Sequence, residues 1–306
     1  MLFRTFVLKI SGLKPFKSLV TKSFLFKPLV RRFVAGEDMV TAMRVGEEYA
    51  ERGFLVSMDR LGENVQTQEE ANRETAAYIE MVKRIAESPN RDRMNISVKL
   101  TAIGLDLGDG LAEENYRKIL VASKAHDIFV RADMEASEYT ARTVKIIDNL
   151  FEEFKNCGTV LQSYLHRTKS DVQHMIEIGA RVRIVKGAYL EPDTVAYQQK
   201  PKVDAMYVEA AKTLLKKGNY PAIATHDLRI VDELKQFIKS QNIPYDRFEW
   251  QMIYGVRRDL QRQLLDEGFN VRIYIPYGPD WYPYFSRRLA ERPANLFFIL
   301  KSLFQK

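Results

Sequence analysis

A segment near the end of the chain, YPYFSRRLAERPAN (residues 282–295), places four polar side chains on one predicted helix face. They stand at i, i+3, i+4 and i+7, a spacing that brings side chains together along one side of a helix. Two of them are arginines, whose planar guanidinium groups bind carboxylates through paired, charge-assisted hydrogen bonds. The face therefore suggests carboxylate recognition, although an exposed helix with an i,i+4 ion pair is the simpler alternative. The four residues are Tyr284, Arg287, Arg288 and Glu291.

Long polar side chains also interrupt several β-rich runs elsewhere in the chain. Burying such groups without partners is strongly unfavourable, so they must either pair with one another or face a polar ligand. For any one of them, a structural ion pair is the expected role. Five such residues on separate strands favour a ligand site instead; they are Lys99, Asp133, Gln162, Arg183 and Glu249.

Other kinds of site are not supported. The four histidines show no metal-ligand spacing, and neither a GxGxxG after a strand nor a P-loop occurs, so no metal, Rossmann or ATP site is expected. The single cysteine, Cys157, excludes an internal disulfide and is expected to be a buried, inert thiol, which fits a reducing cytoplasm.

The elements that must position these residues alternate along the chain. Eight β-rich runs, separated by helix-favouring stretches, predict a parallel sheet closed into a (βα)8 barrel, an α/β fold of the TIM type. In such barrels functional residues lie where the strands end and in the loops that follow. The expected strands are 54–59, 95–100, 128–134, 159–165, 182–189, 222–226, 248–254 and 271–278, and the expected helices are 66–87, 112–125, 137–154, 168–178, 203–217, 229–240 and 256–267.

Charge divides the chain into an arm, residues 1–36, and a barrel domain, residues 37–306. The arm contains eight of the 47 basic residues and no acid, whereas the remaining 39 basic residues nearly balance 40 acids. The arm is therefore predicted to be a basic amphipathic helix that lies on an anionic membrane or docks on the barrel. The neutral body argues against nucleic-acid binding. No run of 18 apolar residues predicts a membrane span, and no secretory signal is expected.

Several segments, taken in order, resemble the flavin-dependent proline dehydrogenases, in particular the short bacterial monofunctional enzymes. They are RFVAGE, ISVKLTAIG, DMEAS, LQSYL, RVRIVKGAY, ATHD, FEWQMIYG, RIYIPYG and YFSRRLAERPAN, which together run from about residue 32 to 300. The resemblance implies a distorted (βα)8 barrel that binds FAD at the strand ends, with the final helix over the barrel mouth. Leu190 departs from an aromatic residue found in some relatives, which leaves details of flavin packing open.

The resemblance also implies residue roles. The arginines Arg287 and Arg288 would grip the proline carboxylate, with Lys99 assisting and Asp133 positioning Arg288 or Lys99. Catalytic roles would fall to Lys99, Asp133 and Arg183. The rest of the substrate pocket would be Tyr189, Tyr274, Tyr284 and Glu291. The expected flavin-site residues are Gln162, Arg183, Val185, Lys186, Gly187, Ala188, Thr225, His226 and Glu249.

The implied reaction is oxidation of L-proline to Δ1-pyrroline-5-carboxylate, with electrons passing to a membrane quinone. Such an enzyme would be cytoplasmic and peripheral on the inner face of the cell membrane. Three alternatives remain open at this point: a hydroxyproline dehydrogenase on the same fold, a Schiff-base lyase or aldolase that uses Lys186 or Lys99, and a non-catalytic membrane-surface module.

Overall fold

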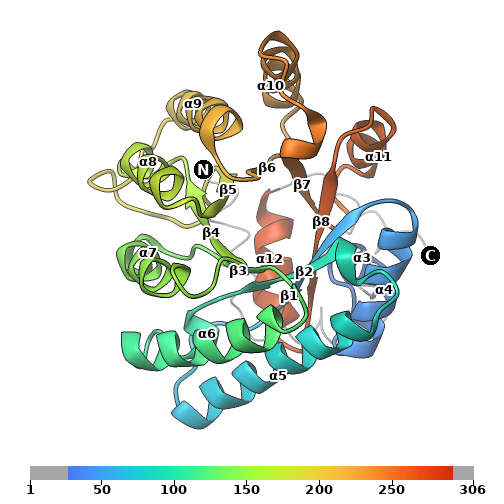
Figure 1. The fold of residues 1–306 in the computed structure, drawn as a ribbon, viewed down its shortest axis with the longest axis vertical. Helices are drawn as coiled ribbons and strands as arrows, with labels where there is room; N and C mark the ends of the chain where they lie inside the picture. The colour runs from blue at the N-terminus through green and yellow to red at the C-terminus, as the bar shows by residue number, and fades with distance from the viewer. Residues whose placement is uncertain (1–26, 292–306) are drawn as a thin grey trace, which may run out of the picture.

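The computed structural model describes residues 27–291, with side chains as far as residue 286. Eight parallel strands form a closed barrel in sequence order, and β8 pairs with β1 to complete it. The predicted fold is therefore confirmed (Figure 1). The strands are β1 Leu55–Arg60, β2 Met94–Val98, β3 Val130–Ala132, β4 Cys157–Gln162, β5 Arg181–Val185, β6 Ala222–Ala224, β7 Glu249–Ile253 and β8 Val271–Tyr277.

Helices surround the barrel and follow the strands one by one. Those after β1 to β7 are α5 Gln68–Glu87, α6 Asp109–Lys124, α7 Ser137–Phe151, α8 Thr168–Ile178, α9 Lys200–Lys217, α10 Leu228–Ser240 and α11 Arg258–Asp266. Before β1 stand α3 Lys27–Phe33 and α4 Met39–Glu51, and after β8 comes α12 Trp281–Glu291. The short 3-10 turns are η2 Arg91–Arg93, η3 Thr101–Ile103 and η4 Tyr245–Arg247.

Local signals explain where several elements begin and end. Thr67 caps α5 by accepting a hydrogen bond from the backbone N–H of Glu70, as its position before two acids predicts. Gly179 ends α8 in the left-handed conformation that glycine adopts without a steric penalty. The strand expected at 182–189 stops at Val185, because Gly187 has φ +111° and leaves the extended conformation.

One continuous apolar core joins the barrel to its helices. Branched side chains such as Val56, Ile96 and Ile273 are fully buried between them, as the near-continuous apolar strands of a parallel sheet require. Cys157 is a buried free thiol, as expected, and burial raises its pKa to about 12. Within residues 27–291, no helix is both long and apolar enough to cross a bilayer.

Helix α12 crosses the centre of the ring of strands in Figure 1 and packs against α3, a contact between distant parts of the sequence. A second apolar cluster makes this joint: Phe33 and Val34 lie with Trp281 and Phe285. The described end of the arm, residues 27–36, thus docks on the barrel domain. The boundary between arm and barrel at residue 36 stays a prediction.

The joint also depends on a close backbone approach. Gly255, in the loop after β7, has φ +74°, and a Cβ built there would lie 1.7 Å from the carbonyl oxygen of Arg32. Any larger residue must therefore move α3 away from the loop. Gly268 has a similar φ of +86°, yet a Cβ there would meet nothing within 4 Å.

These two glycines form a matched pair for a stability test. We expect Gly268→Ala to lower the free energy of unfolding by about 1–2 kcal/mol, the penalty of a left-handed alanine. Gly255→Ala should lose clearly more, because the steric clash with Arg32 adds to the same penalty. Thermal or denaturant unfolding of both variants measures the difference, and equal losses would mean that the contact is not rigid.

Candidate active site at the barrel mouth

A cavity of about 500 Å³ opens at the carboxyl ends of the strands, with Tyr284 of α12 in its wall. The structure brings most of the sequence-predicted site residues to this one cavity. They come from six strands and the segments that follow them, which explains how residues scattered in sequence meet. The predicted residues in its wall are Lys99, Asp133, Gln162, Arg183, Val185, Lys186, Gly187, Ala188, Tyr189, Thr225, His226, Tyr274 and Tyr284.

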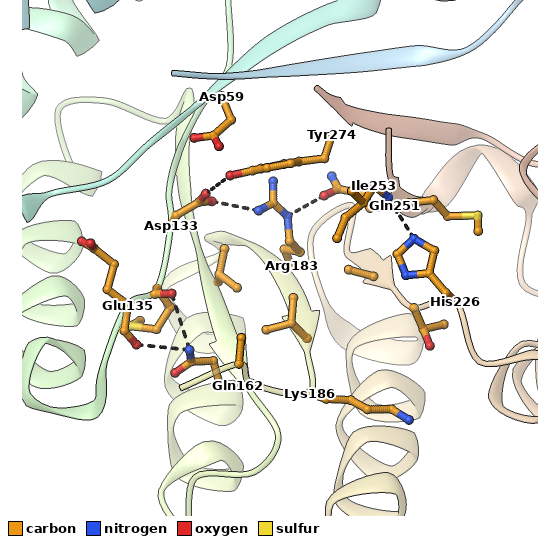
Figure 2. Close-up of a pocket in the computed structure, with 18 of the residues that line it drawn as sticks. Asp59, Asp133, Glu135, Gln162, Arg183, Lys186, His226, Gln251, Ile253 and Tyr274 are labelled. Carbon is orange, nitrogen blue, oxygen red and sulfur yellow. Dashed lines mark hydrogen bonds and ion pairs between the residues drawn. The ribbon is translucent and has the colours of Figure 1, made fainter. Parts of the chain in front are cut away.

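Arg183 is the centre of a buried polar network on the cavity floor (Figure 2). Its guanidinium donates to Asp133 Oδ1 at 2.8 Å, to Ser97 Oγ at 2.9 Å and to the side-chain oxygen of Gln251. Tyr274 donates its hydroxyl to the other carboxylate oxygen of Asp133 at 2.6 Å. The Tyr274 ring also lies 4.9 Å from the guanidinium carbon, a cation–π contact.

Lys99 pairs with Asp59 rather than with Asp133. Its Nζ lies 2.6 Å from Asp59 Oδ1, whereas Arg183 and Tyr274 occupy both oxygens of Asp133. The other predicted partner of Asp133, Arg288, has a side chain outside the described residues. Burial alone would lower the pKa of Lys99, but the carboxylates of Asp59 and Asp133 reverse the effect and raise it. The ammonium form therefore persists in the cavity.

Lys186 is also held by carboxylates. Its Nζ lies 2.6 Å from Asp204 Oδ1 and 3.0 Å from Asp227 Oδ2, at the beginnings of α9 and α10. A Schiff-base enzyme needs a neutral amine as its nucleophile. Because both candidate lysines are engaged in ion pairs, the Schiff-base alternative loses its support.

Gln162 lines the cavity and has an unpaired side-chain oxygen. Its Nε2 donates to the carbonyl oxygen of Glu135 at 3.1 Å, as Figure 2 shows. Its Oε1 is buried and accepts no hydrogen bond within the described residues. A buried unpaired oxygen is unfavourable, so its position in a cavity wall indicates a ligand that donates to it.

Two further features shape the cavity wall. Gly187 lies against the ring of Tyr164, where an added Cβ would approach to 2.3 Å, so only glycine allows this course of the chain. The backbone N–H of Ile253 donates to His226 Nε2 at 3.0 Å. That bond makes Nε2 the acceptor and leaves the proton of the neutral imidazole on Nδ1.

Glu135 follows the same strand as Asp133 and accepts from the backbone and the hydroxyl of Thr101, at 3.2 and 2.5 Å. Burial, the largest influence, raises the pKa of Glu135 to about 7. This carboxyl is therefore partly protonated near neutral pH.

Glu249, which the resemblance assigns to the flavin site, is not among the described residues that line the cavity. It begins β7, two residues before Gln251, and strand alternation points both side chains inward at different depths. Arg272 donates to both of its oxygens at 2.9 and 3.0 Å. Burial alone would raise the pKa of Glu249, but the Arg272 guanidinium outweighs it and holds the pKa below its ordinary value.

Asp59, Glu135 and Gln251 also line the cavity, and no role was assigned to them from the sequence. Their partners Lys99, Thr101 and Arg183 come from other strands or the segments after them, so only the register of the closed barrel reveals the contacts. The predicted residues Arg287, Arg288 and Glu291 belong to α12, but their side chains lie outside the described residues.

Comparison with known proteins identifies the family to which this cavity and barrel belong. A family model described as proline dehydrogenase matches residues 42–300. The chain is 40% identical over 276 residues to "Proline dehydrogenase 1" of Bacillus subtilis, covering 90% of this chain and 91% of the relative. It is 39% identical over 280 residues to "Proline dehydrogenase" of Deinococcus radiodurans, with 90% of each chain covered.

A solved structure of proline utilization A (PutA) from Bdellovibrio bacteriovorus, inactivated by N-propargylglycine, has the same fold. Its TM-score is 0.82 at 25% identity, over 95% of this chain. The present chain spans only 36% of that larger protein, so the likeness concerns one part of it. Because the family model and the full-length relatives cover nearly the whole barrel, this chain belongs to the proline dehydrogenase family.

Proposed function

We propose that the protein is an FAD-dependent dehydrogenase that oxidises L-proline to Δ1-pyrroline-5-carboxylate and passes the electrons to a membrane quinone. The observation that carries the proposal is the charged cavity floor beneath α12. There Lys99 and Arg183 are fixed by Asp59 and Asp133 at 2.6 and 2.8 Å. Cationic groups held in place can bind an anion without reorganising.

The cavity suits a flavin in two respects. The unpaired Gln162 Oε1 can accept from an imide N–H, which the pyrimidine edge of a flavin carries. The wall after β5 also includes the small residues Gly187 and Ala188, which leave room for a planar ring. The residues we assign to hold FAD are Gln162, Arg183, Val185, Lys186, Gly187, Ala188, Thr225 and His226.

Bound FAD would supply the acceptor for the hydride that leaves the proline ring. Arg183 stands ready to stabilise negative charge that develops on that acceptor. Lys99 retains its ammonium charge because its pKa is raised, so it can attract the substrate carboxylate. It also disfavours a cationic substrate nitrogen nearby and thereby favours the neutral amine that oxidation requires.

The carboxylate of proline would be held from above as well as from below. We assign this task to Arg287 and Arg288, with Glu291 one turn farther along α12. Tyr274 and Tyr284 line the cavity and offer rings against which an apolar pyrrolidine can pack. Tyr189 completes the proposed substrate pocket.

An absorbance spectrum of the purified protein, recorded before and after anaerobic addition of L-proline, tests the proposal most directly. Flavin bands that bleach with proline are the expected result, since reduction of the flavin accompanies substrate oxidation. Bands that persist with proline but bleach with hydroxyproline would assign the alternative substrate. A protein that stays colourless when FAD is supplied would refute the flavin assignment.

Removal of either arginine side chain tests the substrate assignment. We expect Arg287→Ala and Arg288→Ala each to raise KM for proline roughly tenfold to a hundredfold, because a hydrogen bond to a charged group contributes about 1.5–3 kcal/mol. The flavin content should remain that of the unsubstituted protein. Steady-state kinetics with a soluble dye as acceptor supply the measurement, and an unchanged KM in both variants would remove the arginines from the substrate site.

The basic arm leads us to place the enzyme at the cytoplasmic face of the cell membrane. Replacing Lys9, Lys14 and Lys17 by Gln should weaken binding to vesicles that contain phosphatidylglycerol, because each basic residue near an anionic surface contributes about 1 kcal/mol. Co-sedimentation measures the change, and proline-dependent dye reduction by the same variant is the folding control. Undiminished sedimentation would mean that the arm is not a membrane contact.

A further inference from the structure

Four arginines gather beside the barrel mouth, in a place that no proposed step of the reaction uses. They line a hollow of about 510 Å³ between α3 and the beginning of α11, together with Pro28 and Asp259. None of them lines the active-site cavity. We call this group the arginine cluster; it consists of Arg31, Arg32, Arg257 and Arg258.

The cluster carries an excess of positive charge, since Asp259 is the one acid that lines the hollow. Arg257 forms an ion pair with Asp259, with its Nη2 at 2.8 Å and its Nε at 3.0 Å from Asp259 Oδ2. Arg31 and Arg258 are exposed and form no ion pair within residues 27–286. Uncompensated guanidinium groups that converge on one hollow repel each other, so the arrangement favours binding of an anion.

The two walls of the hollow are fixed relative to each other. Arg31 and Arg32 come from α3, whereas Arg257 and Arg258 follow β7, more than 200 residues later in sequence. Gly255 lets the backbone of α3 touch the β7–α11 loop, and Arg32 Nε donates to the Gly255 carbonyl at 3.4 Å. The cluster is thus a consequence of the folded joint and not of local sequence.

The cluster also lies at the catalytic end of the barrel. Its second wall belongs to the loop after β7, and such loops stand at the same end as the cavity. Phe33 at the end of α3 packs in one apolar cluster with Tyr284 of α12, which itself lines the cavity. A surface that binds the arginine cluster therefore lies close to the cavity entrance.

We propose that the arginine cluster is a docking surface for the phosphate groups of an anionic lipid bilayer. Guanidinium groups bind phosphate oxygens in paired hydrogen bonds, and Arg31 and Arg258 have donors to spare. The open, exposed position of these two residues suits an extended surface better than an enclosed soluble anion. The preceding sequence, basic and free of acids over residues 1–36, extends the same charge.

Docking in this way turns the barrel mouth toward the bilayer. This consequence rests on the proposed function, in which the electron acceptor is a membrane quinone. When the arginines bind the lipid phosphates, the cavity entrance would lie on the side of the protein that faces the membrane quinone. The arm would then strengthen binding, whereas the arginine cluster would set the orientation.

The test uses the full chain as R31Q/R258Q, which removes two charges that form no ion pair among the described residues. The control, R91Q/R247Q, removes the same charge from two exposed arginines that precede β2 and β7 and so lie at the opposite end of the barrel. Co-sedimentation with vesicles of phosphatidylcholine, with and without phosphatidylglycerol, gives the affinities. We expect R31Q/R258Q to bind the anionic vesicles on the order of 30-fold more weakly, and the control to bind as the unsubstituted protein does.

Activity measurements separate this inference from the proposed function. R31Q/R258Q should reduce a soluble dye with proline at the normal rate, while its reduction of a quinone embedded in anionic vesicles falls. Normal vesicle binding by R31Q/R258Q, or an equal loss in the control, would overturn the docking surface. So would displacement of the unsubstituted protein by inorganic phosphate at constant ionic strength, which would assign a soluble anion instead. If the unsubstituted protein reduced no dye in the presence of proline, the dehydrogenase would be refuted, and the vesicle result would stand by itself.

Discussion

The buried guanidinium of Arg183 is the constraint on which the cavity depends. A charge in the barrel interior is tolerated only when its hydrogen-bond partners are complete, and loss of one partner of a buried pair costs about 3–5 kcal/mol. Asp133, Ser97 and Gln251 provide those partners from three other strands. The barrel must therefore close in one register for the charge to be satisfied, so the site and the fold specify each other.

The barrel interior contains two polar layers, one at the beginnings of the strands and one at their ends. At the beginning of β7, Glu249 accepts from Arg272 through both oxygens and from Gln251 through Oε1. At the strand ends, Gln162 Oε1 and Asp59 Oδ2 are buried without a partner among the described residues. Both of these residues line the cavity, and unused acceptors in a cavity wall are expected where a ligand completes the network.

Alternation along the chain was enough to predict eight strands, their order and the end of the barrel that carries the site, because period and topology are local properties. Alternation was not enough to predict how deep each inward side chain lies in the barrel, or which side chains pair. Glu249 is polar and points inward, as ligand-binding residues do. It lies outside the cavity wall only because it stands two residues before Gln251 in β7. Two carboxylates lie near Lys99, and it pairs with Asp59 because Arg183 already occupies Asp133.

The joint between α3, the β7–α11 loop and α12 was also invisible in the sequence, because Gly255 looks like any loop glycine. Its missing side chain admits the carbonyl of Arg32, and this contact sets the position of α3. Through Phe33, the same helix supports Tyr284 of α12 over the cavity. One backbone approach therefore fixes both the helix whose Tyr284 lines the cavity and the arginines beside it. In the function and docking that we propose, the substrate site and the membrane-facing surface would be aligned because they share this support.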